Sequence, residues 1–358
     1  MRVTRHALGG AILTTALLGS APADAQSVER RTLAGSEVAI YNLVGSIRLE
    51  PGTGADVVAE VGRMGDDGSK LRIETGRLRG RESLRVIYPE RRILFRGDRD
   101  GSRSRTQLWV DEDGTFGDDA DDSDDSRGER YEIVSSGSGM DARADVRVLV
   151  PRGKRVAIHL GAGEATVSNV DGDISVDVHA ADVTTTNTRG SLDLDTGSGE
   201  VRITDAQGDV TLDSGSGDVT MTRVNATRLS LDSGSGSVRG SSIESSDLRL
   251  DSGSGRVTLR GVKSPEIDLD TGSGSVELDL AADVESMRVD AGSGSVTVGV
   301  PESLGARVTI ETGSGGIDVD VPITVTRKSR DYLTGSLGDG RGRLTIESGS
   351  GAVKLRRS

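Results

Sequence analysis

The sequence has no cysteine, which excludes disulfide bonds, thiolate metal sites and cysteine nucleophiles. Only 2% of its 358 residues are aromatic and 34% are hydrophobic, too little bulky material for a conventional globular core. Thin layers of aliphatic side chains are still compatible with this composition, and glycine is abundant, with 50 residues. The composition therefore favours a repeat fold with short strands and tight turns.

No apolar run reaches the roughly 20 residues that a membrane-spanning helix needs. The first apolar run, residues 7–20, follows two arginines and is succeeded by the small-x-small tripeptide ADA. This arrangement is typical of a signal peptide, here over residues 1–25, with cleavage before Gln26. We expect an exported chain, periplasmic or extracellular at the cell surface, with no transmembrane segment in its mature form.

Basic residues are outnumbered, 44 against 57 acidic ones, so the net charge is −13. A nucleic-acid-binding protein would present a basic face to the phosphates, and this balance argues against that class. It is compatible with divalent cations as partners.

A motif of the form [DE]-[ST]-G-S-G-x-[VI] recurs along most of the chain, as in LDSGSGDVTM at 212–221. Its acidic residue returns at spacings of 18, 19, 19, 19, 20, 21 and 36 residues, and we interpret the last spacing as two periods of 18. Counting back by 18 reaches Asp177 and His159, so about eleven coils fit between Val156 and Leu355. The acidic residues of the motif are Asp195, Asp213, Asp232, Asp251, Asp270, Asp290, Glu311 and Glu347.

Apolar residues alternate with polar ones on both sides of each Gly-Ser-Gly, which is the pattern of β-strands. Leu194, Leu212 and Leu231 hold the same place in successive periods. Another apolar ladder predicts a third, shorter buried side: Val170, Ala206, Val224, Ile243 and Val262.

Two topologies accommodate this alternation, an antiparallel sandwich and a parallel β-solenoid. In a solenoid, like residues stack about 4.8 Å apart, and the constant register of like residues favours that arrangement. A sandwich or propeller would tolerate looser spacing and would use more aromatic residues. We therefore predict an all-β, β-helix-like solenoid with 18–21 residues per coil.

Three regions follow the predicted signal peptide. Residues 26–96 are expected to form an N-terminal β-strand region with the first coils, and residues 131–358 the β-solenoid repeat domain. Residues 97–130 contain the last arginines of a basic stretch that begins at Arg77, followed by an acidic run, DEDGTFGDDADDSDD. Such charge blocks predict a disordered insert. The alternative is a cation-binding or partner-binding loop that carries Trp109.

The repeated Asp-Ser-Gly-Ser-Gly predicts a tight corner, with glycine permitting positive φ and close approach of coils, and Asp accepting backbone hydrogen bonds. The adjacent hydroxyl column, which includes Ser214 and Ser233, is expected to be solvated or to line a groove. The predicted structural turn glycines are Gly197, Gly199, Gly215, Gly217, Gly234, Gly236, Gly253, Gly255, Gly272 and Gly274.

The acidic column carries a second interpretation, in which bound cations such as Ca²⁺ relieve the repulsion between its carboxylates. We otherwise expect no cofactor. In a calcium-dependent repeat protein, a chelator would lower the melting temperature. The candidate column is Asp195, Asp213, Asp232, Asp251, Asp270 and Asp290.

Catalytic motifs are missing, including G-x-S-x-G, H-E-x-x-H and the P-loop. His159 and His179 occupy different positions in the coil, and His179 is expected to be a solvated or capping residue. Acids occur in every coil, so no pair stands out as a catalytic pair. We expect no enzymatic activity, the rival interpretation being a β-helix polysaccharide-processing enzyme.

The repeat resembles the bacterial family named "putative adhesin", exported β-strand-repeat domains of unknown function similar to autotransporter adhesin heads. The segments VAIYNLVGSIRLEPGTGADVVAEV and LTGSLGDGRGRLTIESGSGAVKL resemble its first and last repeats. The resemblance implies a β-helix-like fold in a cell-envelope setting and brings no catalytic residues. We expect a non-enzymatic envelope or surface protein, structural or adhesin-like, whose partner is an envelope protein or a polysaccharide.

Overall fold

Alternating apolar and polar residues make most of the chain extended, because each strand can then bury one side. The computed structural model describes residues 28–96, 104–117 and 128–358. Helical structure within these residues is limited to one 3-10 turn, η1 (Gly68–Lys70), so the prediction of an all-β chain is confirmed. In the same part of the chain, no helix is long and apolar enough to cross a membrane. The predicted signal peptide lies outside the described residues.

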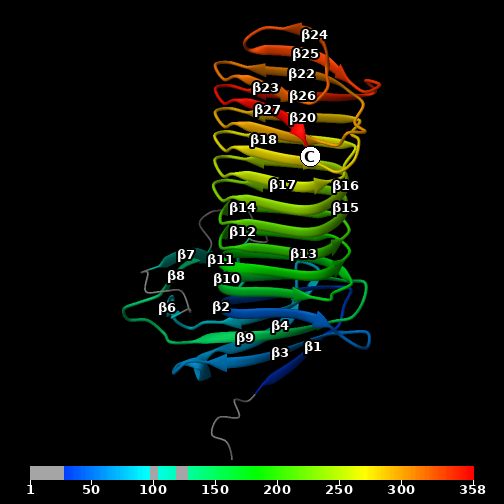
Figure 1. Ribbon diagram of the computed structural model, residues 1–358. Coiled ribbons are helices and arrows are strands. Elements are labelled where there is room, and N and C mark those ends of the chain that lie inside the picture. Colours follow the sequence, from blue (N-terminus) through cyan, green and yellow to red (C-terminus); the bar gives the residue numbers. More distant parts are fainter. Residues whose placement is uncertain (1–27, 97–103, 118–127) are drawn as a thin grey trace, which may run out of the picture.

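Most strands form a stack of rungs with two long faces (Figure 1). The first face holds the strands that precede the Gly-Ser-Gly corner and the second face those that follow it, while several long strands contribute to both. Along the stack the strands are β2 (Glu37–Pro51), β10 (Lys154–Ser168), β11 (Gly172–Arg189), β12 (Leu192–Ser198), β13 (Val201–Gln207), β14 (Val210–Ser216), β15 (Val219–Ser233), β16 (Val238–Ser252), β17 (Val257–Val262), β18 (Glu266–Thr271), β19 (Val276–Leu280), β20 (Ser286–Ala291), β21 (Val296–Val300), β22 (Ala306–Thr312), β23 (Ile317–Asp320), β26 (Gly342–Ser348) and β27 (Val353–Arg357).

Successive rungs pair in parallel and in the register of the repeat. Leu194 is opposite Leu212, and Leu212 is opposite Leu231. All three are at most 2% exposed, and the ladder of the third side, which includes Ala206 and Ile243, is equally buried. The predicted parallel stacking and both apolar ladders are thus confirmed, and the fold is a solenoid-like β structure.

The N-terminal end is closed by strands that leave the repeat pattern. β2 stacks directly on β10, with Val38 opposite Val156, although more than a hundred residues separate them in sequence. On its other edge β2 pairs with β5 and with β9. β4 pairs antiparallel with β5, and β3 pairs antiparallel with β9. β1 in turn pairs antiparallel with β3. These strands are β1 (Glu29–Leu33), β3 (Val57–Met64), β4 (Arg72–Leu78), β5 (Arg81–Ile87) and β9 (Arg143–Val150).

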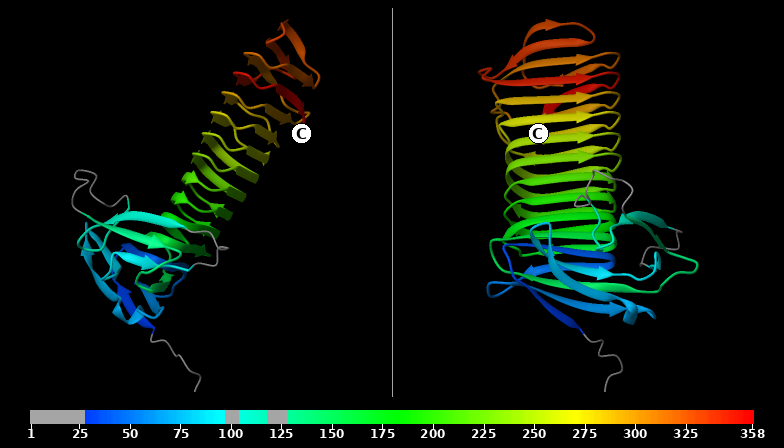
Figure 2. Two further views of the ribbon diagram at one scale, coloured as in Figure 1. Left: turned by 90° about the vertical axis from the view of Figure 1, so that its left-hand side faces the viewer. Right: turned by 180° about the vertical axis from the view of Figure 1, so that it is seen from behind.

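A three-stranded side sheet stands beside the first rungs (Figure 2). It consists of β6 (Arg92–Leu94), β7 (Arg105–Val110) and β8 (Glu129–Val134). The prediction of a disordered insert over 97–130 is therefore wrong for the described residues 105–110, which pair antiparallel with β8. The alternation in TQLWV buries Leu108 and Val110, and this apolar content outweighs the surrounding charge.

The C-terminal rungs do not stack in sequence order. The prediction that the 36-residue spacing holds two successive coils is wrong, because Glu311 is directly opposite Glu347. β26 and β27 lie between β20/β21 on one side and β22/β23 on the other. The intervening residues form a hairpin, β24 (Thr324–Lys328) and β25 (Tyr332–Leu337), that packs antiparallel onto β22.

Candidate functional site

The repeated corner separates its hydroxyl groups from its carboxylates. In a strand, successive side chains point to opposite sides, so the Asp of each motif faces outward and the next residue faces the core. Glycine N–H groups donate to these inward hydroxyls at the later corners. The bonds are Gly274 N–H to Thr271 Oγ1 (3.1 Å), Gly315 N–H to Thr312 Oγ1 (2.7 Å) and Gly351 N–H to Ser348 Oγ (2.9 Å).

Two predictions about the corner are therefore wrong. The hydroxyls do not line a groove, since Ser214, Ser233 and Ser252 are all 0% exposed. The outward aspartates form none of the corner hydrogen bonds found at the later corners. At these later corners the hydroxyl stabilises the turn, because it is short enough to reach the N–H three residues on from inside the corner. At earlier corners the buried hydroxyls of Thr196, Ser214 and Ser252 make no hydrogen bond among the described residues.

The ten predicted turn glycines all lie where consecutive rungs meet. A Cβ at any of them would lie within 3 Å of a carbonyl oxygen of the preceding rung, as at Gly236, where Gly217 O would be 1.6 Å away. Positive φ is confined to Gly199 and Gly217 within this set. Close approach of the backbones, rather than positive φ, is thus the main reason for glycine here. The set is Gly197, Gly199, Gly215, Gly217, Gly234, Gly236, Gly253, Gly255, Gly272 and Gly274.

The outward carboxylates form one continuous column on the first face, which we call the acidic column. It comprises Asp177, Asp195, Asp213, Asp232, Asp251, Asp270, Asp290, Glu347 and Glu311, each opposite the next in the parallel register. Neighbours are therefore about 4.8 Å apart, one strand spacing. Like charges at that distance repel each other.

Compensation of this charge is uneven along the column. Arg288 reaches Asp290 (2.8 Å) and Glu347 (3.4 Å) near the C-terminal end. Within the part of the chain that the structure describes, the carboxylates of Asp213, Asp232, Asp251 and Asp270 make no ion pair or hydrogen bond. Partial burial and the neighbouring Asp290 and Asp251 raise the pKa of Asp270, as expected for a crowded row of carboxylates.

The column does not form a metal centre of known type. Across residues 28–96, 104–117 and 128–358, no three His, Asp or Glu side chains are grouped closely enough to hold one ion. The predicted calcium column, Asp195, Asp213, Asp232, Asp251, Asp270 and Asp290, is thus a row of carboxylates without a cluster. Calcium ligands normally surround the ion with six to eight oxygens, which a straight row cannot do.

At its N-terminal end the column continues into aromatic residues. His159 is opposite both Asp177 and Tyr41, and its Nδ1 lies 3.0 Å from Asp177 Oδ2. The imidazole stacks on the Tyr41 ring, with centroids 4.4 Å apart, and Phe116 packs edge-on against both rings. Phe116 belongs to the loop after β7, so this cluster attaches the side sheet to the stack. His179, by contrast, is partly exposed and lies outside the cluster.

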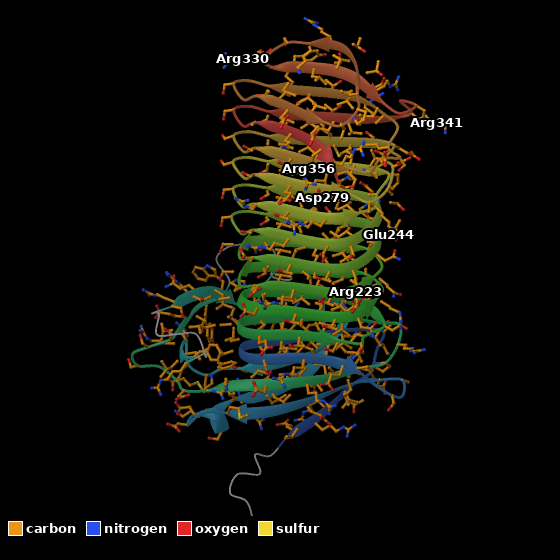
Figure 3. All side chains as sticks on the ribbon, in the orientation of Figure 1. Arg223, Glu244, Asp279, Arg330, Arg341 and Arg356 are labelled. Atoms are coloured by element: carbon orange, nitrogen blue, oxygen red, sulfur yellow. The ribbon has the colours of Figure 1, made fainter. Side chains whose placement is uncertain are left out.

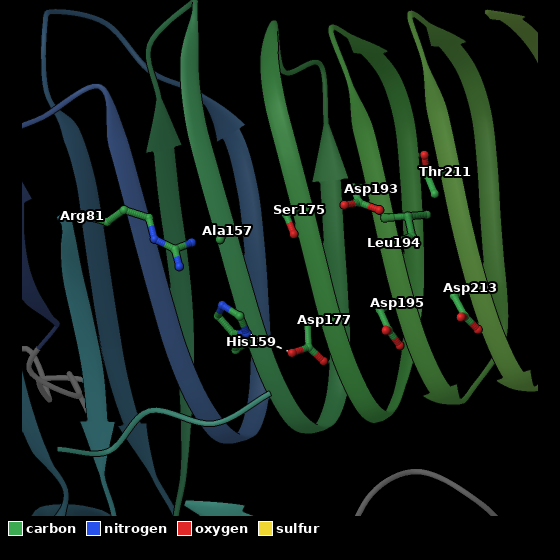
Figure 4. Close-up of a pocket in the computed structure, with 10 residues that line it drawn as sticks. All are labelled: Arg81, Ala157, His159, Ser175, Asp177, Asp193, Leu194, Asp195, Thr211 and Asp213. Carbon is green, nitrogen blue, oxygen red and sulfur yellow. Dashed lines mark hydrogen bonds and ion pairs between the residues drawn. The ribbon is translucent and has the colours of Figure 1, made fainter. Parts of the chain in front are cut away.

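A groove beside this cluster combines acids with one arginine (Figure 4). Asp193 lies there on the outward side of β12, and partial burial raises the pKa of its carboxyl, although much of the side chain stays in contact with solvent. Arg81 reaches the groove from β5, which pairs with β2 at the N-terminal end of the same row of strands (Figure 4). The groove is lined by Arg81, Ala157, His159, Ser175, Asp177, Asp193, Leu194, Asp195, Thr211 and Asp213.

Sequence reasoning found the acidic column but missed the groove. Asp195 and Asp213 were singled out by the repeat, whereas Asp193 and Arg81 belong to no repeated motif. The 18-residue spacing of His159 and Asp177 placed them one rung apart, and that spacing was the available signal for their contact.

Comparisons with known proteins place the chain in a family. A solved structure from Clostridium sporogenes ATCC 15579, described as a "putative cell adhesion protein", is 11% identical, with coverage of 93% of this chain and 99% of that one. Its TM-score is 0.19, so the two structures superpose poorly. No curated protein matches the sequence. The model of the Toastrack DUF4097 family matches residues 123–356, which is more than half of the chain and includes every rung after β2. The chain therefore belongs to the Toastrack DUF4097 family.

Proposed function

We propose that this chain is an exported, non-enzymatic module of the cell envelope or surface, structural or adhesin-like, built on a parallel β-solenoid. The observation that carries the proposal is the acidic column, in which four successive carboxylates, from Asp213 to Asp270, project from a rigid face and make no ion pair among the described residues. A periodic, charged face suits a partner that is itself extended and repetitive.

The partner proposed for this face is an envelope polysaccharide or an envelope protein. A polysaccharide offers repeated hydroxyl groups, and an envelope protein can offer basic side chains, both of which hydrogen-bond to carboxylates. The net charge of −13 supports neither a DNA nor an RNA partner. Export is supported by the apolar run and cleavage pattern of residues 1–25.

The binding test compares two variants of the mature chain, residues 26–358. The first replaces Asp213, Asp232, Asp251 and Asp270 by Asn. The second is a control of equal charge change outside the column, with Glu164, Glu244, Glu285 and Glu302 replaced by Gln. We expect the parent and the control to retain envelope material from extracts, and the column variant to retain much less. Equal retention by both variants would contradict a role for the column.

The export test follows the full-length chain and a chain without residues 2–25 in fractionated cells. We expect the full-length chain outside the cytoplasm, cleaved before Gln26 as read by N-terminal sequencing, and the shortened chain inside. An uncleaved full-length chain in the cytoplasm would overturn the proposed location.

A second candidate function is polysaccharide processing at the groove of Figure 4. The observation that favours it is the raised pKa of Asp193 beside Asp195, since glycoside hydrolysis uses one protonated and one ionised carboxyl. Turnover of a polysaccharide by the purified chain, lost in Asp193→Asn and kept in Asp251→Asn, would favour the enzyme. Absence of turnover across a polysaccharide panel would favour the binding module.

A further inference from the structure

The rung formed by β26 and β27 lies between two rungs that precede it in the chain (Figure 1). β26 pairs with β20 on one side and with β22 on the other, and β27 pairs in the same way with β21 and β23. From β10 to β21, by contrast, the rungs stack in sequence order. We call residues 342–357 the inserted rung.

The two rungs beside the inserted rung match each other as well as they match it. Val289 and Ile310 are both opposite Ile346, in one register and on the core side. Without the inserted rung, β22 and β23 could therefore lie directly on β20 and β21 with apolar residues against apolar residues. The pairs that would meet are Met287 with Val308, Val289 with Ile310, Val296 with Ile317 and Val298 with Val319.

The corners and the connections suit both ways of stacking. A Cβ at Gly313 would lie 2.2 Å from Gly349 O, and a Cβ at Gly349 would lie 2.2 Å from Gly292 O, so each corner has the same glycine for close approach. Residues 301–305, which join β21 to β22, pass the inserted rung and climb two rungs. Residues 281–285, which are equal in number, climb only one rung from β19 to β20. The longer climb is thus not built into the length of the chain.

Opposite charge surrounds the inserted rung on the second face. Arg356 reaches past β21 to Asp279, 2.7 Å away (Figure 3), and Lys354 pairs with Asp318 at 3.1 Å. Without the inserted rung, Asp320 would lie one strand spacing closer to the like charge of Asp279. The basic side chains of the inserted rung therefore favour its place between two acidic rungs.

We infer that the protein has a second stacking state, in which the inserted rung is released and β22 and β23 lie directly on β20 and β21. Release exchanges two rung interfaces for one, so its cost is that of a terminal rung rather than that of a gap in the stack. The hairpin of β24 and β25 brings the inserted rung to its place, and the opposite charges hold it there.

During folding the released state forms first. Asp290 and Glu311 are 21 residues apart in sequence, whereas Asp290 and Glu347 are 57 residues apart. The shorter loop costs less entropy to close, so β22 reaches β20 before β26 does. The inserted rung then enters by separating two rungs that are already paired.

Disulfide trapping in the mature chain, residues 26–358, distinguishes the two states, because the sequence has no cysteine of its own. The adjacent pair is Asp290→Cys with Glu347→Cys, on strands about 4.8 Å apart. The separated pair is Asp290→Cys with Glu311→Cys, two strand spacings or about 10 Å apart, which is too far for a disulfide. In the released state the separated pair becomes adjacent.

We expect the folded protein to oxidise the adjacent pair at least about tenfold faster than the separated pair. When oxidation accompanies refolding from urea, the separated pair should be captured. A further pair that is two rungs apart, Asp213→Cys with Asp251→Cys, should stay reduced in both conditions. Equal capture of this further pair during refolding would assign the capture to the unfolded chain and overturn the inference.

Charge reversal tests what holds the inserted rung. Added to the separated pair, Lys354→Glu with Arg356→Glu should raise its oxidation rate in the folded protein at least about tenfold, because the released state becomes more populated. The matched control, Arg202→Glu with Arg239→Glu, breaks two ion pairs on the same face away from the inserted rung and should leave the rate unchanged. If circular dichroism shows that the Lys354 and Arg356 variant does not fold, the refolding measurement decides. A separated pair that is not captured during refolding, while the adjacent pair oxidises, would overturn the inference.

Discussion

The two ends of the stack are closed to different extents. At the N-terminal end, β5 and β9 pair with the two parts of β2 and buried residues such as Leu33, Val61 and Val146 cover the core. At the C-terminal end, the hairpin covers the first face and leaves β23 with a single partner among the described strands. The repeat can define rungs, but it cannot terminate them, because each rung presents two open edges. Termination requires sequence that departs from the repeat.

The interior and the open rung should respond differently to the same substitution. Leu231→Asp places a carboxylate at a position that is 2% exposed, in the middle of the apolar ladder. An unpaired buried charge costs several kcal/mol or more, so we expect this variant not to fold. Ile317→Asp, on the partly exposed rung at the C-terminal end, should fold and melt a few degrees below the parent.

Circular dichroism during heating checks this pair of variants. If Leu231→Asp melts like the parent, the assignment of the core face is wrong. If Ile317→Asp also prevents folding, the second face of the C-terminal end is closed in solution to the same degree as the interior.

Corners can be compared in the same way. Gly236→Ala would bring a Cβ to 1.6 Å from Gly217 O, so two rungs would have to separate, whereas Gly316→Ala at the terminal rung meets no atom within 4 Å. We expect the first substitution to destabilise the protein by about 2–3 kcal/mol and the second by less than about 0.5 kcal/mol. Urea unfolding followed by circular dichroism measures both. Equal losses would show that the corners are looser than the close contacts indicate.

The stability of the closed N-terminal end should depend on a buried network of hydrogen bonds. The Tyr88 hydroxyl lies 2.9 Å from both Asn42 Oδ1 and the Val44 carbonyl oxygen, and Asn42 Nδ2 donates to Ala144 O at 2.8 Å. Burial raises the pKa of Tyr88, so the hydroxyl stays protonated and can donate. Tyr88→Phe leaves buried acceptors without this donor, and we expect a loss of about 1–2 kcal/mol in urea unfolding.

Tyr131→Phe is the matched control for that substitution. Tyr131 donates to the Tyr88 carbonyl oxygen at 3.1 Å but is only partly buried, so water can replace its hydroxyl. We expect a loss of about half a kcal/mol or less. A loss as large as that of Tyr88→Phe would mean that burial does not decide the strength of this network.

The sequence was sufficient to predict the rungs of the stack, but it was not sufficient to predict the order in which the last rungs stack. Spacings of 18 to 21 residues placed Leu194, Leu212 and Leu231 in one ladder, because residue identity repeats with the rung. The same similarity hid the position of the last rung, since the motifs at Glu311 and Glu347 are equally able to stack on Asp290. Only the hairpin between them, which has no repeat pattern, decides the order.

The candidate site was predictable to a similar degree. The repeat identified the acidic column, but it could not show which side of the corner each side chain occupies; Ser214 turned inward where a solvated residue was expected. The groove depends on Arg81, which reaches the stack from a strand of the N-terminal end, and no spacing in the sequence links it to Asp193. Contacts between repeat and non-repeat segments leave no periodic signal.

The smallest expected effect concerns the acidic column, in which Arg288 forms ion pairs with Asp290 and Glu347, whereas the central carboxylates form none among the described residues. Partial burial and, after it, the neighbouring carboxylates raise the pKa of Asp270. A group whose pKa is raised by folding favours the folded state at low pH, and this contribution is lost as the pH rises through the raised value. Asp270→Asn should therefore stabilise the protein at pH 7 by a few tenths of a kcal/mol, a small effect because the carboxyl is exposed and screened.

The expected gain should vanish near pH 3, where Asp270 is protonated, and shrink in high salt. Asp290→Asn is the matched control: it removes a carboxylate that Arg288 holds at 2.8 Å, so it should leave the stability at pH 7 unchanged or lower. Urea unfolding at both pH values measures the two variants. If both variants gain equally at pH 7, Arg288 does not neutralise its end of the column, and the two parts of the acidic face are electrostatically alike.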